Sequence, residues 1–160
     1  MSDIHCDKVG LSDLAFLSKI KKFSPDIIVI TGDILDSYKN DMDVAYNILS
    51  QLAIIAPCYF TSGNHELRLP KEYAELQNML AKLKITHLHN ESLLLNRNQD
   101  FINLVGVEDY NFFKNEDNLN HRANFKNTLE NLYSSKFFNI LLSHRPEKFP
   151  IYVETKYDLI

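Results

Sequence analysis

Short β-branched runs alternate with apolar stripes at helical spacing, and this alternation is the strongest constraint on the fold. The strand patterns cover residues 26–30, 57–60, 101–107 and 139–142, with weaker patterns at 93–95 and 157–160. The helical stripes run through residues 11–20, 42–52, 73–83 and 125–132. Strands that alternate with helices favour an α/β layered fold with a largely parallel sheet in the first half of the chain.

Two of the predicted helices carry recognisable start signals. We expect Asn40 or Asp41 to cap the helix over 42–52, because a short polar side chain can accept from the first unpaired N–H groups. Pro70 suits the first turn of the helix over 73–83, where its missing N–H is not needed.

Length, charge and cysteine content narrow the function. The chain has 160 residues and a formal net charge of −4. That size suits a single domain, and a general nucleic-acid binder would show a basic surface instead. No apolar run is long enough to span a bilayer, and the polar first residues do not resemble a signal peptide. Cys6 and Cys58 predict two thiols in a reducing, cytoplasmic compartment, with a single disulfide as the alternative.

Polar residues that can bind a metal follow three of the predicted strands and also open the chain. They are Asp3, His5, Asp33, Asp36, Asn64, His65, Glu66 and His144. Alone, each segment has a plainer interpretation as a polar terminus, a turn or a buried structural histidine. In open α/β sheets, however, sites form outside the carboxyl ends of strands, so the four segments can meet at one place.

The combined donor set favours a metal site. Carboxylate, amide and imidazole groups without thiolate suit Mn²⁺, Fe or Zn²⁺ better than Ca²⁺ or a structural zinc site. Two such ions roughly 3.5–4 Å apart can clamp a phosphoryl group. A carboxylate is the group best able to bridge them.

Four motifs, in this order, resemble the signature of the calcineurin-like metallophosphoesterase family. They are Asp3-x-His5, Gly32-Asp33-x-x-Asp36, Gly63-Asn64-His65-Glu66 and His144. The flanking residues 25–33 and 141–147 resemble the bacterial branch that is often tethered to membranes. The resemblance implies an α/β/β/α sandwich, present here in part, with a mixed, largely parallel first sheet and one domain over residues 1–160.

The resemblance also implies a set of metal ligands for two divalent ions. Asp3 and His5 would hold the first ion, and Asp33 would bridge the two. Asn64 and His144 would hold the second ion. Mn, Fe and Zn all remain candidates, since ligand type alone does not choose among them.

Three further roles follow from the same resemblance. His65 would face the substrate and protonate the leaving oxygen, or stabilise the transition state as imidazolium. Asp36 or Glu66 would orient neighbouring groups. The nucleophile would be a metal-bound hydroxide, so no serine or cysteine need attack.

The chain also departs from the family pattern at both ends. The family has an apolar strand before Asp-x-His, and here only Met1 and Ser2 precede Asp3. Its Gly-His-x-His motif follows the next strand after His144, which here would be residues 157–160. We therefore expect a domain that lacks its first strand, this motif and its closing strands. Unpaired sheet edges would then offer surfaces for association.

The favoured function is hydrolysis of phosphodiester or phosphomonoester bonds at a two-metal site. The alternative is a truncated, non-catalytic remnant that binds metal weakly. A nuclease is disfavoured by the acidic balance and by the lack of a basic aromatic platform. The expected partner is a phosphate ester, and the expected location is the cytoplasm, or a membrane surface if an N-terminal anchor exists in a longer protein.

Other polar residues receive plainer predictions. His87 and His89 form a His-x-His pair that we interpret as surface or loop histidines. Cys6 is expected to be a small buried side chain rather than a soft ligand. Arg68 and Arg145 could each meet a phosphate, but an ordinary surface arginine is as good an interpretation.

Overall fold

The computed structural model describes residues 1–6, 14–39, 41–114 and 120–160. Its first half contains α1 (Leu14–Phe23), β1 (Ile28–Thr31), α2 (Met42–Ile55), β2 (Cys58–Thr61), α3 (Asn64–Arg68), α4 (Pro70–Lys82) and β3 (Thr86–His87). Its second half contains β4 (Glu91–Arg97), β5 (Asp100–Gly106), α5 (His121–Leu132), β6 (Phe138–Leu142) and α6 (Phe149–Tyr152), with 3₁₀ turns η1 (Tyr110–Phe113) and η2 (Pro146–Lys148).

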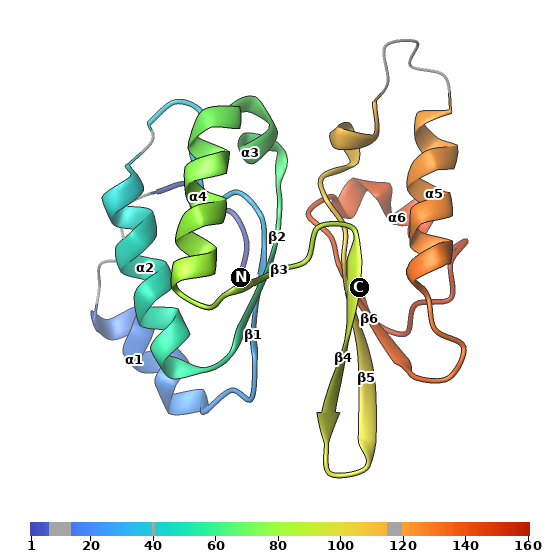
Figure 1. Ribbon diagram of the computed structural model, residues 1–160, viewed down its shortest axis with the longest axis horizontal. Coiled ribbons are helices and arrows are strands. Elements are labelled where there is room, and N and C mark those ends of the chain that lie inside the picture. The colour runs from blue at the N-terminus through green and yellow to red at the C-terminus, as the bar shows by residue number, and fades with distance from the viewer. Residues whose placement is uncertain (7–13, 40, 115–119) are drawn as a thin grey trace.

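These elements form four layers (Figure 1). Helices α1, α2 and α4 cover the outer face of one sheet, α5 and α6 cover the outer face of a second sheet, and the two sheets face each other. The predicted α/β/β/α sandwich is therefore confirmed for the described part of the chain.

Within the described residues, each sheet contains three strands. The first has the order β1-β2-β3 and is parallel throughout, with Ile28 opposite Cys58 and Thr31 opposite Thr61. The second has the order β4-β5-β6, in which β4 is antiparallel and β6 parallel to β5. The weak strand pattern over 157–160 gives only one bridge, between Leu159 and Ile140.

Three apolar clusters fill the three interfaces between the layers. Alternate residues of a strand point to opposite faces, which places Phe60 toward the helices and Tyr59 toward the other sheet. The helix side of the first sheet buries, among others, Ile30, Leu49, Leu52, Phe60 and Leu76. The space between the sheets holds Tyr59, Leu88, Leu104 and Leu142. The helix side of the second sheet holds Val105, Phe125, Leu129, Leu141 and others.

The first residues lie alongside β1. The Met1 ammonium donates to the Val29 carbonyl at 2.8 Å, and the Thr31 N–H donates to the Met1 carbonyl at 2.8 Å. The N–H groups of Asp3 and His5 then donate to the carbonyls of Gly32 and Asp33, at 3.2 and 2.9 Å. This pairing carries the first motif to the carboxyl end of β1.

The two predicted helix starts are confirmed at Asp41 and Pro70. The Asp41 carboxylate caps α2 by accepting from the Val44 N–H at 3.2 Å, and Pro70 is the first residue of α4. The alternative cap Asn40 lies outside the described residues, as does Leu11 of the first stripe. Among the described helices, none combines the length and the apolar character that a membrane span requires.

Candidate metal centre

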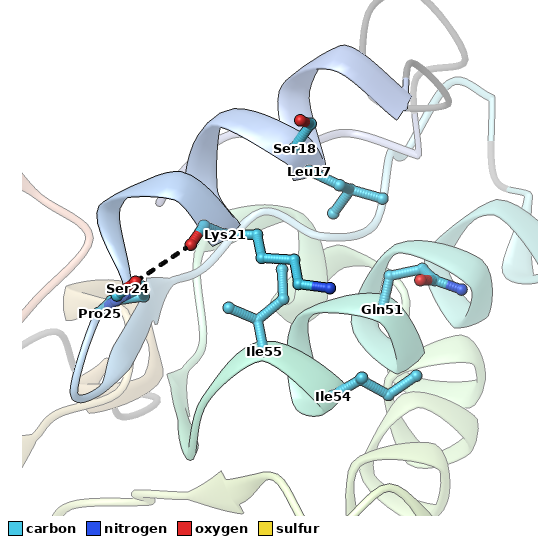
Figure 2. A pocket seen from close by; sticks show the side chains of 8 residues that line it. All are labelled: Leu17, Ser18, Lys21, Ser24, Pro25, Gln51, Ile54 and Ile55. Carbon is cyan, nitrogen blue, oxygen red and sulfur yellow. Dashed lines mark hydrogen bonds between the residues drawn. The ribbon is translucent and has the colours of Figure 1, made fainter.

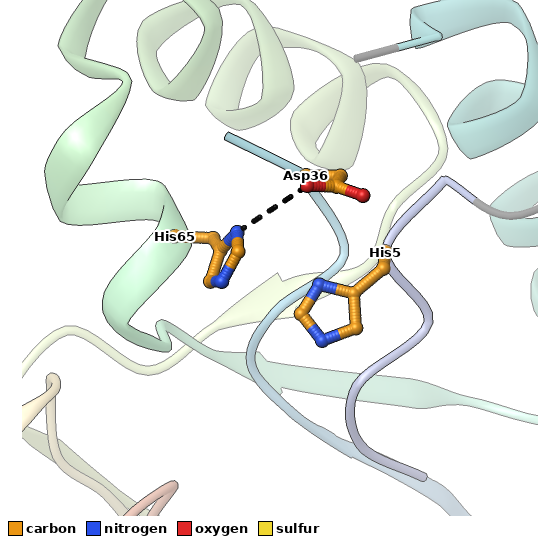
Figure 3. A group of neighbouring side chains, drawn as sticks. All are labelled: His5, Asp36 and His65. Carbon is orange, nitrogen blue, oxygen red and sulfur yellow. Dashed lines mark ion pairs between the residues drawn. The ribbon is translucent and has the colours of Figure 1, made fainter. Parts of the chain in front are cut away.

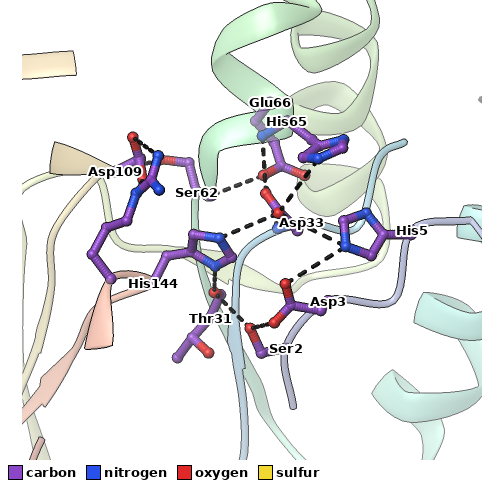
Figure 4. Close-up of polar contacts among 12 residues, drawn as sticks. Ser2, Asp3, His5, Thr31, Asp33, Ser62, His65, Glu66, Asp109 and His144 are labelled. Atoms are coloured by element: carbon purple, nitrogen blue, oxygen red, sulfur yellow. Dashed lines mark hydrogen bonds and ion pairs between the residues drawn. The ribbon is translucent and has the colours of Figure 1, made fainter. Parts of the chain in front are cut away.

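Three loops and the start of the chain converge at the carboxyl ends of β1, β2 and β6 (Figure 4). Asp33 follows β1, His65 lies in the first turn of α3 directly after β2, and His144 follows β6. Asp3 and His5 reach the same place from the segment beside β1. The prediction that these strand ends meet is therefore borne out by the geometry.

Asp33 lies at the centre of this cluster. Its Oδ2 is 3.2 Å from Nε2 of His144, 3.9 Å from Nε2 of His5 and 3.9 Å from Nε2 of His65. Its Oδ1 accepts the backbone N–H of His65 at 2.9 Å. Burial alone would raise the pKa of Asp33, but the contacts from His144 and His65 hold it below its usual value. One ionised oxygen therefore faces three imidazoles.

Two overlapping groups of side chains are close enough to share a cation. Ligand atoms of Asp3, His5 and Asp33 all lie within 4.8 Å of one another, and those of His5, Asp36 and His65 do so as well. Figure 3 shows the second group, in which Oδ1 of Asp36 is 3.8 Å from Nδ1 of His65. Carboxylates and imidazoles without a thiolate fit a divalent cation, so the residues present suit a metal.

Backbone partners assign opposite tautomers to two of the histidines. Nδ1 of His144 donates to the Thr31 carbonyl at 2.8 Å, so its neutral form offers the Nε2 lone pair toward Asp33. Nδ1 of His65 accepts the Ser37 N–H at 2.9 Å, so its neutral form carries the proton on Nε2. His144 is thus set up as a ligand, and His65 as a donor.

Three candidate ligands have unusual backbone conformations. Asp3, His5 and Asp33 have φ values of 57°, 53° and 53°, in the left-handed region. Each such residue costs about 1–2 kcal/mol, and this kind of strain is concentrated at functional sites. Six other described non-glycine residues, among them Lys84 and Asn98, share this region, so the strain alone does not mark the site.

Two glycines allow the loops to touch. A Cβ on Gly32, whose φ is +86°, would lie 2.3 Å from the Gly63 nitrogen. A Cβ on Gly63 would lie 2.2 Å from Oδ1 of Asp33. The glycine of each motif is required because the two loops pack backbone against backbone.

Glu66 joins these loops from beneath. Its side chain is fully buried and accepts three backbone N–H groups, from Asp33 at 2.9 Å, Leu35 at 3.0 Å and Gly63 at 2.7 Å. The carboxylate therefore holds the Asp33 loop against the Gly63 turn. Asn64 begins α3 on this turn, between Gly63 and His65, with a half-buried side chain.

The remaining polar candidates lie outside the two groups. His87 is half-buried, with its Nε2 3.1 Å from the Tyr73 hydroxyl, and burial lowers its pKa to about 4. Its interpretation as a surface or loop histidine is therefore wrong. His89 is exposed beside Glu108, at 3.0 Å. Cys6 is buried, as expected.

The two arginines differ from each other. Arg68 is exposed at the end of α3. Arg145 is only 21% exposed at its side chain and pairs with Asp109, so it is not an ordinary surface arginine. Thr31 and Ser37 contact His144 and His65 through their backbone carbonyl and N–H, so no side-chain motif in the sequence points to them.

A separate pocket of about 560 Å³ lies between α1 and α2 (Figure 2). Lys21, Gln51 and Ile54 are among the residues that line it. It is formed by the ends of helices that lead into β1 and β2, so it lies at the amino edge of the first sheet. The candidate ligands lie at the opposite, carboxyl edge.

Metal binding should weaken as the pH falls below about 9. Burial lowers the pKa of His144, but the bond to Asp33 outweighs burial and raises it to about 9. Near neutral pH the metal-free protein therefore carries a proton on His144 that a cation must displace, which costs about tenfold in affinity per pH unit. The stability of the metal-free protein depends on pH in the opposite direction. The His144–Asp33 ion pair stabilises the fold fully below the unfolded histidine pKa of about 6.5, and this contribution is lost as the pH rises through about 9.

Calorimetric titration of the metal-free protein with Mn²⁺, in two buffers of different ionisation enthalpy, measures this proton. We expect release of about one proton when the ion at His144 binds near neutral pH. A His89→Ala variant, which changes an exposed histidine outside the cluster, should release the same number. Binding without proton release would contradict the role of His144.

Known proteins resemble this chain over most of its length. The family model for calcineurin-like phosphoesterases matches residues 1–158. The "Transmembrane protein with metallophosphoesterase domain" of Bos taurus is 31% identical over 157 residues, which cover 91% of this chain and 34% of that protein. The metallophosphoesterase YkoQ of Bacillus subtilis (strain 168) is 26% identical over 149 residues, covering 91% of this chain and 52% of that protein.

The metallophosphoesterase Cj0846 of Campylobacter jejuni is 27% identical over 164 residues, covering 100% of this chain and 41% of that protein. The chain thus spans about a third to a half of the length of these curated relatives. The match of the family model extends over nearly every residue, including all four motifs that meet at Asp33. The chain belongs to the calcineurin-like phosphoesterase family.

Proposed function

We propose that this protein is a metal-dependent phosphoesterase that hydrolyses phosphodiester or phosphomonoester bonds at a two-metal site. The observation that carries the proposal is the position of Asp33, whose Oδ2 faces three imidazoles. A buried, ionised carboxylate in that position is suited to bridge two cations.

Two ligand sets share this carboxylate. Asp3, His5 and Asp33 form the first, which corresponds to one of the compact groups. Asp33, Asn64 and His144 form the second. Bound Mn²⁺, Fe or Zn²⁺ ions would polarise the phosphoryl oxygens and activate a water molecule.

His65 supplies the proton. Its Nδ1 is occupied by the Ser37 N–H, so Nε2–H points into the centre near Asp33. The side chain is only 12% exposed, which keeps the ring in one orientation. His65 therefore donates from Nε2 to the leaving oxygen.

The net negative charge of the chain favours small phosphate esters over nucleic acid as substrates. The formal net charge is −4, whereas nucleic-acid binding draws on clustered positive charge. A phosphate ester that the two cations bind directly does not need such a surface.

Hydrolysis of bis(p-nitrophenyl) phosphate, with and without Mn²⁺, tests the function. We expect Mn²⁺-dependent turnover by the wild type and a loss of about 10²–10⁴-fold in kcat for His65→Ala, which removes the proton donor. His89→Ala is the matched control and should retain full activity. If the folded wild type binds Mn²⁺ but stays at background, the chain binds metal without catalysis.

A further inference from the structure

Arg145, the residue directly after His144, is held by a buried carboxylate. Its Nε donates to Oδ2 of Asp109 at 2.5 Å, and a terminal nitrogen donates to Oδ1 at 3.3 Å. The Asp109 side chain is fully buried. Paired Arg–carboxylate bonds of this kind fix orientation as well as position.

Asp109 is in turn fixed to both sheets. It follows β5 of the second sheet, and its N–H donates to Oγ of Ser62, in the loop after β2 of the first sheet. That bond is 3.3 Å long. Its Oδ1 also accepts the Asn111 N–H at 2.9 Å. The carboxylate is therefore a rigid anchor close to the turn that carries Asn64.

The other side of the His144 loop is anchored by Tyr152. Its hydroxyl donates to the Arg145 carbonyl at 2.8 Å and lies 2.7 Å from Oγ of Ser143. Tyr152 is buried. The residues before and after His144 are thus both tied down, while the His144 ring itself is held by the Thr31 carbonyl.

We propose that Arg145 and Asp109 are positioning residues for His144, and that their ion pair sets the affinity of the second cation. This inference rests on the proposed function, in which His144 is a ligand of that cation. The pair keeps Nε2 of His144 within 3.2 Å of Oδ2 of Asp33, so the two ligands are placed before a cation arrives. The Arg145 guanidinium is already shared between Asp109 and Glu147, which argues against a primary role in binding substrate phosphate.

Calorimetric titration of the metal-free protein with Mn²⁺ tests the inference without any measurement of activity. For Arg145→Met we expect the Kd of one of the two ions to rise about 10–100-fold, as found when groups that orient a ligand are removed. Arg145→Lys, which keeps the charge but loses the paired geometry, should show a smaller rise. Asp109→Asn should resemble Arg145→Met, and the double variant should be no worse than either single one.

The matched control is a second Arg–Asp pair of the described residues, Arg97 with Asp26, which is exposed and 3.0 Å long. Arg97→Met should bind both ions as the wild type does. Thermal unfolding in EDTA shows which variants fold. If Arg145→Met does not fold, the Mn²⁺ affinity of the milder Arg145→Lys variant tests the positioning role instead.

Two outcomes separate this inference from the proposed function. If His144→Ala keeps both ions at wild-type affinity, the ligand assignment fails. If His144→Ala loses one ion but folded Arg145→Met and Asp109→Asn keep both, only the positioning role is overturned. An equal loss of affinity for both ions in Arg145→Met and Asp109→Asn would also overturn the positioning role. Such a result would indicate a general loosening of the fold, which affects both ions alike.

Discussion

Replacing Asp33 with asparagine should abolish metal-dependent hydrolysis, lowering kcat/KM by on the order of 10³-fold or more. In the proposed two-metal site this carboxylate belongs to both ligand sets, and its Oδ2 faces His5, His65 and His144. Asparagine is neutral and offers one oxygen, so its NH₂ group would face either the imidazoles or the backbone N–H of His65, donor against donor. A bridge between two cations cannot form from such a side chain.

The measurement is kcat/KM for bis(p-nitrophenyl) phosphate at saturating Mn²⁺, with metal content determined on the same samples. Asp26→Asn, at an aspartate whose side chain is 80% exposed, is the matched control and should leave the rate unchanged. Asp33→Asn should also bind fewer ions than the control. Retention of activity within about tenfold of the wild type would refute a bridging role.

The position of the site could be predicted in part because one topological rule decides it. Neighbouring parallel strands end at the same edge of a sheet, so the polar residues after β1 and β2, Asp33 and His65, approach one another. His144 follows β6 of the facing sheet, and the packing of the two sheets against each other brings it to Asp33. Asp3 and His5 join them because the first residues pair with the backbone of β1 and its loop.

Several features of the site depend on contacts that no linear pattern records. The tautomers of His65 and His144 are assigned by a backbone N–H and a backbone carbonyl, from Ser37 and Thr31. Side-chain identity at Ser37 and Thr31 carries little of that information. The Arg145–Asp109 pair joins residues 36 positions apart, and neither belongs to a metal-binding motif.

Short elements were the weakest part of the prediction of the fold. The weak strand pattern over 157–160 predicts a strand, but Leu159 forms one bridge and is 53% exposed. Without burial on one face, β-propensity alone does not produce a ladder. The interpretation of His87 as a surface histidine is wrong for a related reason. Its ring is half-buried against Tyr73 of α4 and Phe60 of β2, which are distant in sequence.

Replacing Glu66 with glutamine should destabilise the protein by about 3 kcal/mol and lower the midpoint of thermal unfolding by about 6–10 °C. Three N–H groups share the two carboxylate oxygens of this fully buried side chain. Glutamine has one carbonyl oxygen, so its NH₂ group must face at least one N–H, donor against donor. Burial raises the pKa of Glu66, and the three N–H groups oppose that rise.

Urea unfolding in EDTA measures this loss without any contribution from bound metal. Glu75→Gln, on the exposed side of α4, makes the same chemical change without buried partners and should cost less than about 0.5 kcal/mol. Glu66→Gln should also weaken Mn²⁺ binding, because its carboxylate holds the Asp33 loop against the Gly63 turn. A folded Glu66→Gln protein with wild-type stability and wild-type Mn²⁺ affinity would show that the two loops keep their positions without this carboxylate.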